Sequence, residues 1–466
     1  MAKFISIPGN EIQWLTWGDD NNGRTFVYKD RLFRAILWKS ADLFHFLFEA
    51  GILRTLMEKG LVVETRMTDH VVDGYAMVVE HERLPFVSYP YEWSFSMLKD
   101  AGLLVVEIAK ILDSWNLSLA DTHPWNILFD GTKPIWVDIG SIIGRANQAG
   151  RAVRSEFDSH YTAPLRLQHN QHLLRVIKRL QQDELSGISP EEYYSLSKGM
   201  FPCGLKEHVM YSFLKKYNHR VNGFPMKGLH RFTRHMPFIL YGENDEDTSG
   251  LMECRIRNIN IKLHDSQWGS YRDNDEEMQL EVLERQKIRG IQISEAIKRY
   301  RPKALIDLAG NVGHYSIMAS ALGVKKVICV DYDLTAIEKL YEKLKSLKYN
   351  ILPLTFNVMA PPGGLDSTCA RFKCDMAIAL AVTHHLSLTQ RISFDFIAKT
   401  FAGYTNKYLL VEFMPFGLGI GENSPNLPEW YTLDNFKAAL ERYFKTIEVR
   451  FTNIECNNRT LLICEK

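Results

Sequence analysis

After residue 280, short apolar runs alternate along the chain with stretches that read as helices. The first run is followed by GHYSIMASALG (313–323), for which we predict a helix, and the last two runs suit an antiparallel pair. Strands that alternate with helices are typical of a mainly parallel α/β sheet. The predicted strands are KALIDLAG (303–310), KKVICVDYD (325–333), YNILPLTFNV (349–358), CDMAIALAV (374–382), NKYLLVEFMP (406–415), FKTIEVRFT (444–452) and NRTLLICEK (458–466).

Residues 1–150 mix short strands and helices in a less regular order, which favours an α+β domain. ADLFHFLFEAGILRTLMEKG has helical periodicity and ends at a glycine, as helices often do. The other predicted elements are a strand pair at 24–30 and 31–37, a strand at 75–81, a helix at 98–115 and two short strands around the turn Asp130-Gly131.

The pattern divides the chain into four segments. Residues 151–240 look helical and carry no motif, so we predict a helical extension of the first domain. Residues 241–280 are polar and charged, as in GENDEDTSG and YRDNDEE, and we predict a linker there. The α/β domain then covers residues 281–466.

Composition narrows the functional classes. A chain of 466 residues is long for one domain, and a net charge of +1 gives no general attraction to nucleic acid or to an anionic membrane. The seven cysteines are scattered without a C-x-x-C pair, which argues against a structural zinc site or a disulfide framework. The sequence has no run of about 18 apolar residues, so we predict no membrane span and expect a cytoplasmic protein.

Candidate chemistry lies at the carboxyl ends of the predicted α/β strands, where ligands bind in open sheets. The first strand ends in DLAGNVG, and Asp331 follows Asp307 by 24 residues, an offset at which nucleotide-binding folds carry an acid for the ribose. Asn357 ends the third strand, and His384 and His385 follow the fourth. Glu412 lies at the end of the fifth strand.

Residues 280–466 resemble the class I S-adenosylmethionine-dependent methyltransferases. In that family the loop after strand 1 is rich in glycine, and Ala309 replaces one of those glycines here. The resemblance implies that Asp307 lies near the methionine ammonium, Asp331 accepts from the ribose hydroxyls and Asn357 reads the adenine edge. The residues assigned to S-adenosyl-L-methionine are Asp307, Ala309, Gly310, Asn311, Gly313, Asp331 and Asn357.

The predicted catalytic residues are His384, His385 and Glu412. A histidine can deprotonate an acceptor hydroxyl because its pKa lies close to physiological pH. Adjacent residues on a helix point about 100° apart, so we expect one histidine to face the methyl group and the other to pack. Both histidines could instead only frame the cofactor. Nothing in the spacing indicates a metal site.

LADTHPWNILFDGTKPIWVDIGS, in the N-terminal half, resembles the aminoglycoside-phosphotransferase branch of the protein-kinase-like fold. The resemblance implies that Asp121 takes a substrate proton, whereas Asn126 and Asp138 hold magnesium on the phosphates of ATP. The strand that should present a phosphate-binding lysine has Arg34 instead, and GDDNNG is a poor phosphate loop. We therefore favour a scaffold over a working kinase with Mg-ATP.

The order of a kinase-like half followed by a methyltransferase half, with YPYEWSFSM, LPLTFNV and ALAVTHHL, resembles the NoeA-type host-specific nodulation proteins of rhizobia. The resemblance implies O-methylation of a saccharide or lipo-oligosaccharide, such as a nodulation signal or a surface polysaccharide. Three alternatives stay open: a catalytically degenerate scaffold, a bifunctional kinase-methyltransferase, and an RNA methyltransferase, which the neutral net charge disfavours. The sequence does not indicate the oligomeric state.

Overall fold

A computed structural model describes most of the chain. The described residues are 4–19, 22–145, 150–182, 186–198, 209, 212, 236–238, 248–266, 268–269, 280–347, 349–419, 426–453 and 459–466. They form two compact units, which are not contiguous in sequence. The first unit takes its described residues from 1–85, 97–128 and 133–262, and the second from 86–96, 129–132 and 263–466.

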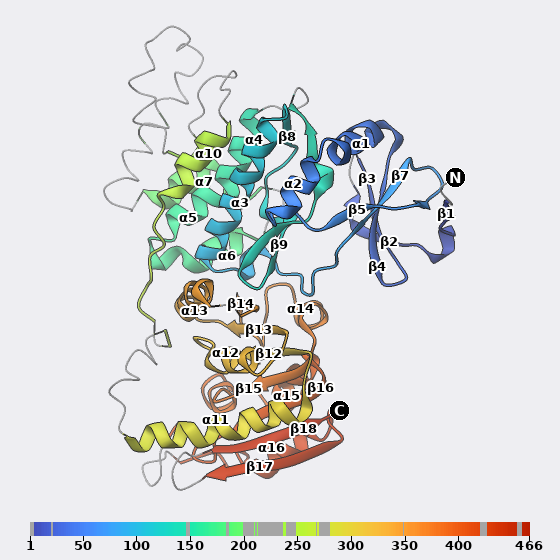
Figure 1. The fold of residues 1–466 in the computed structure, drawn as a ribbon. Coiled ribbons are helices and arrows are strands. Elements are labelled where there is room, and N and C mark those ends of the chain that lie inside the picture. The colour runs from blue at the N-terminus through green and yellow to red at the C-terminus, as the bar shows by residue number, and fades with distance from the viewer. Residues whose placement is uncertain are drawn as a thin grey trace. The chain divides into compact units, whose positions relative to one another are not determined.

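The second unit is built on a seven-stranded sheet in the order β14-β13-β12-β15-β16-β18-β17 (Figure 1). The strands from β14 to β16 are parallel, and β18 pairs antiparallel with both of its neighbours. This order confirms the predicted α/β sheet of the class I methyltransferase fold. The strands are β12 (Ala304–Leu308), β13 (Lys326–Asp331), β14 (Ile351–Thr355), β15 (Cys374–Ala379), β16 (Thr405–Phe413), β17 (Thr446–Asn453) and β18 (Arg459–Glu465).

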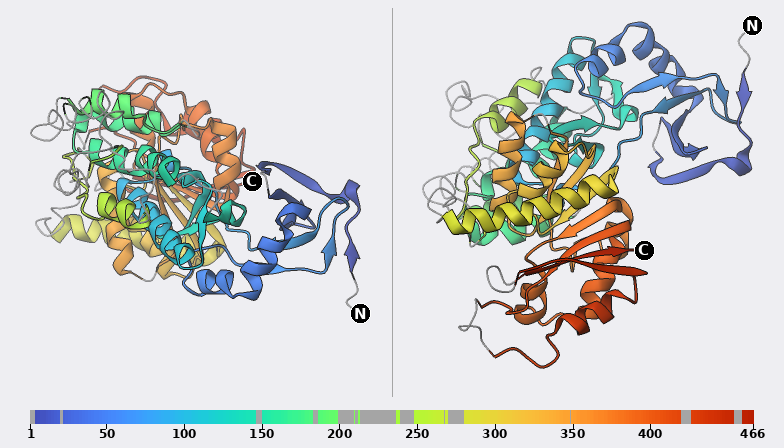
Figure 2. Two further views of the ribbon diagram at one scale, coloured as in Figure 1. Left: turned by 90° about the horizontal axis from the view of Figure 1, so that it is seen from above. Right: turned by 60° about the horizontal axis from the view of Figure 1, so that its bottom comes forward.

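Helices cover both faces of this sheet (Figure 2). Leu410 of β16 belongs to a buried cluster with residues of α11, α12 and α13, whereas Phe413 packs on Phe394 of α15 and Phe436 of α16. Positions 410 and 413 point to opposite faces because side chains alternate along a strand. The helices are α11 (Leu280–Tyr300), α12 (His314–Ala321), α13 (Leu334–Ser346), α14 (Leu365–Phe372), α15 (Phe394–Gly403) and α16 (Leu433–Leu440).

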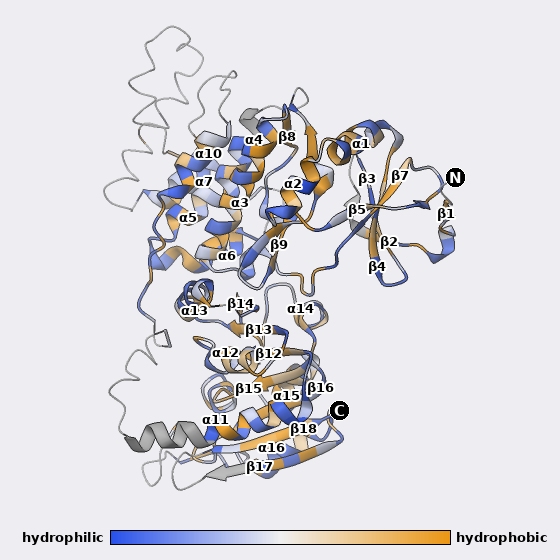
Figure 3. Cartoon of the chain, in the orientation of Figure 1, coloured by the Kyte–Doolittle hydropathy of each residue, from blue (hydrophilic) through white to orange (hydrophobic). Residues whose placement is uncertain are grey.

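Local sequence explains where these elements begin. The Asp333 side chain caps α13 by accepting from the backbone N–H groups of Thr335 and Ala336, and the Ser393 hydroxyl caps α15 in the same way. The described part of α11 alternates hydrophilic and hydrophobic positions, as expected for a helix with one face on the sheet (Figure 3). The central strands are short and buried, which matches their near-continuous apolar runs.

The first unit contains an antiparallel sheet in the order β2-β3-β4-β7-β5, followed by a mainly helical part. This arrangement confirms the predicted α+β kinase-like domain. Its strands are β1 (Ile5–Ser6), β2 (Gln13–Asp19), β3 (Gly23–Tyr28), β4 (Arg31–Ile36), β5 (Thr65–Met67), β6 (His70–Val71), β7 (Met77–His81), β8 (Leu117–Leu119), β9 (Ile127–Asp130, in this unit up to Leu128), β10 (Lys133–Trp136) and β11 (Ile142–Gly144). Its helices are α1 (Ala41–Glu49), α2 (Ile52–Glu58), α3 (Phe95–Asp113, in this unit from Met97), α4 (Gly150–Phe157), α5 (Ala163–Leu167), α6 (Leu174–Leu180), α7 (Pro190–Ser197) and α10 (Thr248–Arg257).

One predicted helix of this unit is wrong as a single element. The structure divides residues 41–60 into α1 and α2, with Gly51 between them at a φ of +73°. A left-handed residue cannot continue a right-handed helix, and glycine adopts it without steric cost. The strand pair of β3 and β4 and the hairpin around Asp130-Gly131 are confirmed.

The two units do not coincide with the four consecutive segments predicted from the sequence. The described residues within 151–240 lie in the first unit, and residues 264–266 and 268–269, inside the predicted linker, lie in the second. Residues 86–96 and 129–132 of the N-terminal half also belong to the second unit. Among the described helices, none is long and apolar enough to cross a membrane.

Candidate functional site

The loop after β12 is held in an unusual backbone conformation. Ala309, Asn311 and Gly313 all have positive φ angles, of 61°, 51° and 73°. Gly310 is required for a different reason, because a Cβ there would lie 2.6 Å from Cys329 Sγ and 2.8 Å from the Asp307 carboxylate. The loop is therefore a specific, strained turn rather than an ordinary connection between strand and helix.

Replacing Ala309 with glycine should stabilise the second unit. Alanine at positive φ costs on the order of 1 kcal/mol, since its Cβ approaches the neighbouring backbone. We expect Ala309→Gly to raise the free energy of unfolding by about that amount, measured by denaturant unfolding of the full chain. An Ala319→Gly variant, in the middle of α12, is the control and should lower stability. Equal losses in both variants would show that the left-handed turn carries no strain.

Asp331 is joined to this loop. One carboxylate oxygen accepts from the Asn311 N–H at 2.8 Å, and the other accepts from the Asp333 N–H at 2.9 Å. The side chain is buried, with 5% of its surface exposed, and this burial raises its pKa to about 6. The carboxylate is thus fixed at the end of β13, beside the turn that follows β12.

The other two predicted polar residues lie at the same edge of the sheet. Asp307 is buried at the end of β12 and accepts from the Ser316 hydroxyl at 2.7 Å. Asn357 follows β14 and is exposed, and its side-chain oxygen accepts from the Met359 N–H at 2.9 Å. The Asn357 side chain is therefore accessible beside this edge of the sheet.

Residues 264–266 and 268–269 contribute to this site, although they fall within the predicted linker. The Trp268 carbonyl accepts from the Asn311 amide at 2.8 Å, and the Gly269 carbonyl accepts from Lys339 Nζ at 2.8 Å. Thr335 donates to the carbonyl of His264 at 2.8 Å. The only signal in the sequence was a Trp-Gly pair within a polar stretch, which is weak evidence for a binding segment.

The two histidines after β15 differ in accessibility. His384 is 6% exposed, and burial lowers its pKa to about 3. No described residue lies within hydrogen-bonding distance of its Nδ1. His385 is only partly buried, burial lowers its pKa from the ordinary value, and its ring lies 5.0 Å from that of Trp268. This difference favours His385 as the residue that meets an acceptor.

The environment of Glu412 favours a structural role. Its carboxylate accepts from Arg289 Nε and Nη2, both at 2.6 Å, and from Arg459 Nη1 at 2.9 Å. The Ala381 N–H donates to the same group at 2.8 Å, and Ala381 has a positive φ of 54°. The two guanidinium groups outweigh the effect of burial and keep the pKa of Glu412 below its ordinary value. A carboxylate held in this way is a poor proton acceptor.

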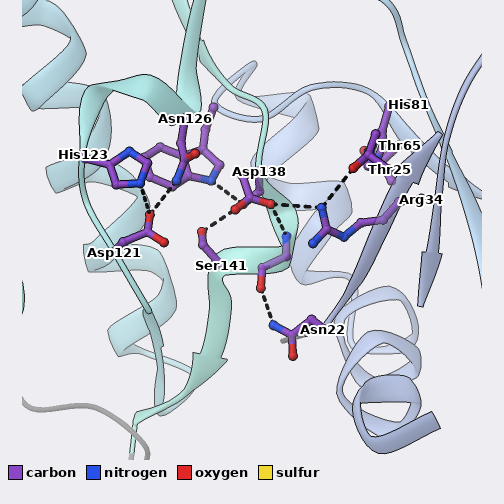
Figure 4. Close-up of polar contacts among 12 residues, drawn as sticks. Asn22, Thr25, Arg34, Thr65, His81, Asp121, His123, Asn126, Asp138 and Ser141 are labelled. Atoms are coloured by element: carbon purple, nitrogen blue, oxygen red, sulfur yellow. Dashed lines mark hydrogen bonds and ion pairs between the residues drawn. The ribbon is translucent and has the colours of Figure 1, made fainter. Parts of the chain in front are cut away.

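The kinase-like residues lie together in the first unit as two pairs (Figure 4). The Asn126 amide donates to Asp121 at 2.5 Å, and the backbone carbonyl of Asn126 accepts from the Val137 N–H. Asp138 accepts from the Gly140 N–H at 3.0 Å and pairs with Arg34 Nη1 at 3.4 Å. Figure 4 shows the two pairs in one region of the first unit, with the Arg34 guanidinium beside Asp138.

The Arg34 guanidinium lies where it competes with a cation for Asp138. Arg34 is buried and its guanidinium pairs with that carboxylate, so it neutralises the negative charge directly. Among the described residues, no group of three or more His, Cys, Asp or Glu side chains could hold a metal ion.

The aromatic segment 89–93 lies in the second unit and is packed rather than open. Trp93 is fully buried, donates from Nε1 to the Ser88 hydroxyl at 2.9 Å and contacts Phe129. Tyr91 is also buried. Packing of this kind is typical of core aromatic residues.

Comparison with known proteins gives one similar sequence and several similar folds. The chain is 23% identical to nodulation protein NoeA of Rhizobium meliloti (strain 1021) over 395 residues, which are 80% of this chain and 79% of that protein. This similarity confirms the resemblance to NoeA-type proteins. No protein-family model matches the chain.

Three solved structures are among those with a similar fold. TehB from Haemophilus influenzae has 19% identity and a TM-score of 0.27, and the match covers 37% of this chain and 61% of TehB. WbdD, described as a bifunctional kinase-methyltransferase, has 14% identity and a TM-score of 0.30, and the match covers 38% of this chain and 39% of WbdD. The magnesium protoporphyrin IX methyltransferase ChlM from Synechocystis PCC 6803 with bound SAM has 15% identity and a TM-score of 0.25, and the match covers 35% of this chain and 69% of ChlM. The matched part spans less than two thirds of the TehB and WbdD chains.

Proposed function

We propose that the chain is an S-adenosylmethionine-dependent methyltransferase that O-methylates a saccharide, such as a nodulation signal or a surface polysaccharide. The observation that carries this proposal is the linkage of Asp331 to the left-handed turn after β12, at the carboxyl edge of a class I methyltransferase sheet. The similarity to a nodulation protein supports the role in nodulation.

The residues present fit the cofactor. S-adenosylmethionine has two ribose hydroxyls, which need an acceptor, and Asp331 is a fixed carboxylate beside the turn. It also has an ammonium group, for which the buried Asp307 carboxylate is the complementary charge. Asn357 presents an amide that can read the adenine edge. Gly310 and Gly313 keep the turn free of side chains that would clash with neighbouring residues.

The bound cofactor supplies an activated methyl group, and the chain supplies position and a proton acceptor. His385 is neutral at physiological pH because its pKa is lowered, so it can accept the proton of an acceptor hydroxyl. The Trp268 ring beside it limits its orientation. Glu412 holds the backbone of Ala381 and, through its own carbonyl, the Thr383 hydroxyl, and so positions the segment that leads to both histidines.

Asp331→Asn should weaken cofactor binding. The full chain should bind S-adenosylhomocysteine in isothermal titration, and loss of this carboxylate should reduce the affinity at least about tenfold. Because burial raises the pKa of Asp331 to about 6, its ionised fraction falls about tenfold at one unit below that value. The wild-type affinity should therefore decrease on acidification through this range, and the affinity of the variant should not.

Asp333→Asn is the matched control for this titration. Asp333 lies two residues further along and caps α13, a role that asparagine fills equally well. We expect this variant to bind as the wild type does. No binding by folded wild-type protein, or equal losses in the two variants, would contradict the proposal.

For the N-terminal half we propose a scaffold without phosphoryl transfer, because Arg34 already neutralises Asp138. Mg-ATP at millimolar concentration should then give no increase in melting temperature, since only a ligand that binds the folded state stabilises it. A clear increase that disappears in Asp138→Ala would instead indicate a bifunctional kinase-methyltransferase. Asn22→Ala is the control, because it removes a contact with the Gly140 carbonyl and leaves the Asp138 carboxylate in place.

A further inference from the structure

We propose that Arg289 binds the carboxylate of the cofactor's methionine moiety, an inference that rests on the proposed function and adds a residue that recognises one specific group. The methionine end of S-adenosylmethionine carries an ammonium and a carboxylate on the same carbon. The acids at the edge of the sheet account for the ammonium and the ribose, and the sequence assigned no residue to the carboxylate. The site therefore needs a cation close to Asp307.

Arg289 is that cation. It lies on α11 and is 8% exposed, and its guanidinium is 4.9 Å from the ring centre of Tyr315, at the start of α12. Burial works against its charged form, but the carboxylate of Glu412 and, more weakly, that of Asp307 raise its pKa above the ordinary value. The side chain is thus permanently charged and lies within the electrostatic range of Asp307, where the amino-acid part of the cofactor is expected.

The hydrogen bonds of Arg289 leave donors available. Nε and Nη2 both donate to Glu412, at 2.6 Å, in a bidentate pair. Among the residues that the structure describes, none accepts from Nη1. A guanidinium has five N–H donors, so a bound carboxylate can be recognised without breaking the pair with Glu412.

The charges around Glu412 also favour an anionic ligand. Arg289 and Arg459 both pair with this one carboxylate, so these three side chains together carry one positive charge, which the nearby Asp307 carboxylate offsets. Once the ammonium of the cofactor engages Asp307, the positive charge needs another partner, and a ligand carboxylate would supply it. Asp307 remains for the ammonium, so the site would match both charges of the zwitterion.

Titration with two ligands tests this assignment. S-adenosylhomocysteine carries the carboxylate, whereas decarboxylated S-adenosylhomocysteine keeps the amine and lacks only that group. We expect the wild-type chain to prefer the first ligand. In Arg289→Met the affinity for S-adenosylhomocysteine should fall about ten- to hundredfold, and the affinity for the decarboxylated ligand should change little, so the preference is lost.

Arg459→Met is the matched control, because Arg459 also pairs with Glu412 but lies at the start of β18 instead of on α11. It should keep the preference for the carboxylated ligand. Arg289→Lys retains a charge for Glu412 and thus the fold, but lacks the planar fork, and should show a reduced preference. A wild-type preference in both Arg289 variants would overturn the assignment. Failure of the wild type to bind either ligand would instead overturn the proposed function itself.

Discussion

His385→Gln should lower the turnover number for methyl transfer by about 10²–10⁴-fold, the usual contribution of a general base. Glutamine keeps the size and polarity of the side chain but cannot accept a proton. S-adenosylhomocysteine should still bind with wild-type affinity, because His385 does not belong to the residues assigned to the cofactor. The measurement is the rate of methyl transfer to a surface-glycan extract together with a binding titration.

The rate of methyl transfer should depend on pH in a defined direction. Burial lowers the pKa of His385 from its ordinary value, so the ring is neutral and able to accept a proton at physiological pH. The wild-type rate should fall as the pH decreases through that lowered pKa, because the ring becomes protonated. This decrease in rate at low pH should be absent in His385→Gln. His384→Gln, at the buried neighbour, is the control and should retain the decrease. A normal rate in His385→Gln would show that both histidines only frame the cofactor.

Arg371→Met should destabilise the second unit by about 3–5 kcal/mol. The Arg371 guanidinium pairs with Glu92, which is fully buried, and lies between the rings of Tyr89 and Phe372, at 4.2 and 4.5 Å. Removing one partner of a buried ion pair leaves the other charge without compensation, which is the main source of the loss.

Denaturant unfolding of the full chain measures this change. The transition of the second unit is identified as the one that S-adenosylhomocysteine shifts, because the ligand stabilises only the unit that binds it. The double variant Glu92→Leu with Arg371→Met removes both charges and should recover a large part of the lost stability. Lys407→Met, which removes an exposed partner of Asp375, is the control and should change stability by less than about 1 kcal/mol. Equal effects of Arg371→Met and Lys407→Met would contradict the account.

Much of the α/β sheet could be predicted because its signals are local. The buried strands appear as short apolar runs, and each ends close to the residue at which its run ends. The separation of Asp307 and Asp331 reflects one strand–helix–strand unit, and the structure joins Asp331 to the same turn through Asn311. The β3–β4 pair was predicted for the same reason.

The remaining features depend on contacts between residues that are distant in sequence. Glu412 looked like a candidate base at a strand end, but only the fold reveals that Arg289 and Arg459 occupy its carboxylate. Trp268 lies in a polar stretch, and its place beside His385 follows from hydrogen bonds that join His264, Trp268 and Gly269 to two other segments, the turn after β12 and α13. Periodicity did not reveal the break at Gly51, because apolar spacing continues across it.

Methyl transfer to the glycan tests the central claim most directly. The full chain is incubated with S-adenosylmethionine that carries a deuterated methyl group and with surface glycans and nodulation signals from a strain that lacks the protein, and the products are examined by mass spectrometry. The account predicts a glycan whose mass increases by one deuterated methyl group, with the wild-type chain and not with Asp331→Asn. Wild-type protein that binds S-adenosylhomocysteine but labels no glycan would contradict saccharide methylation.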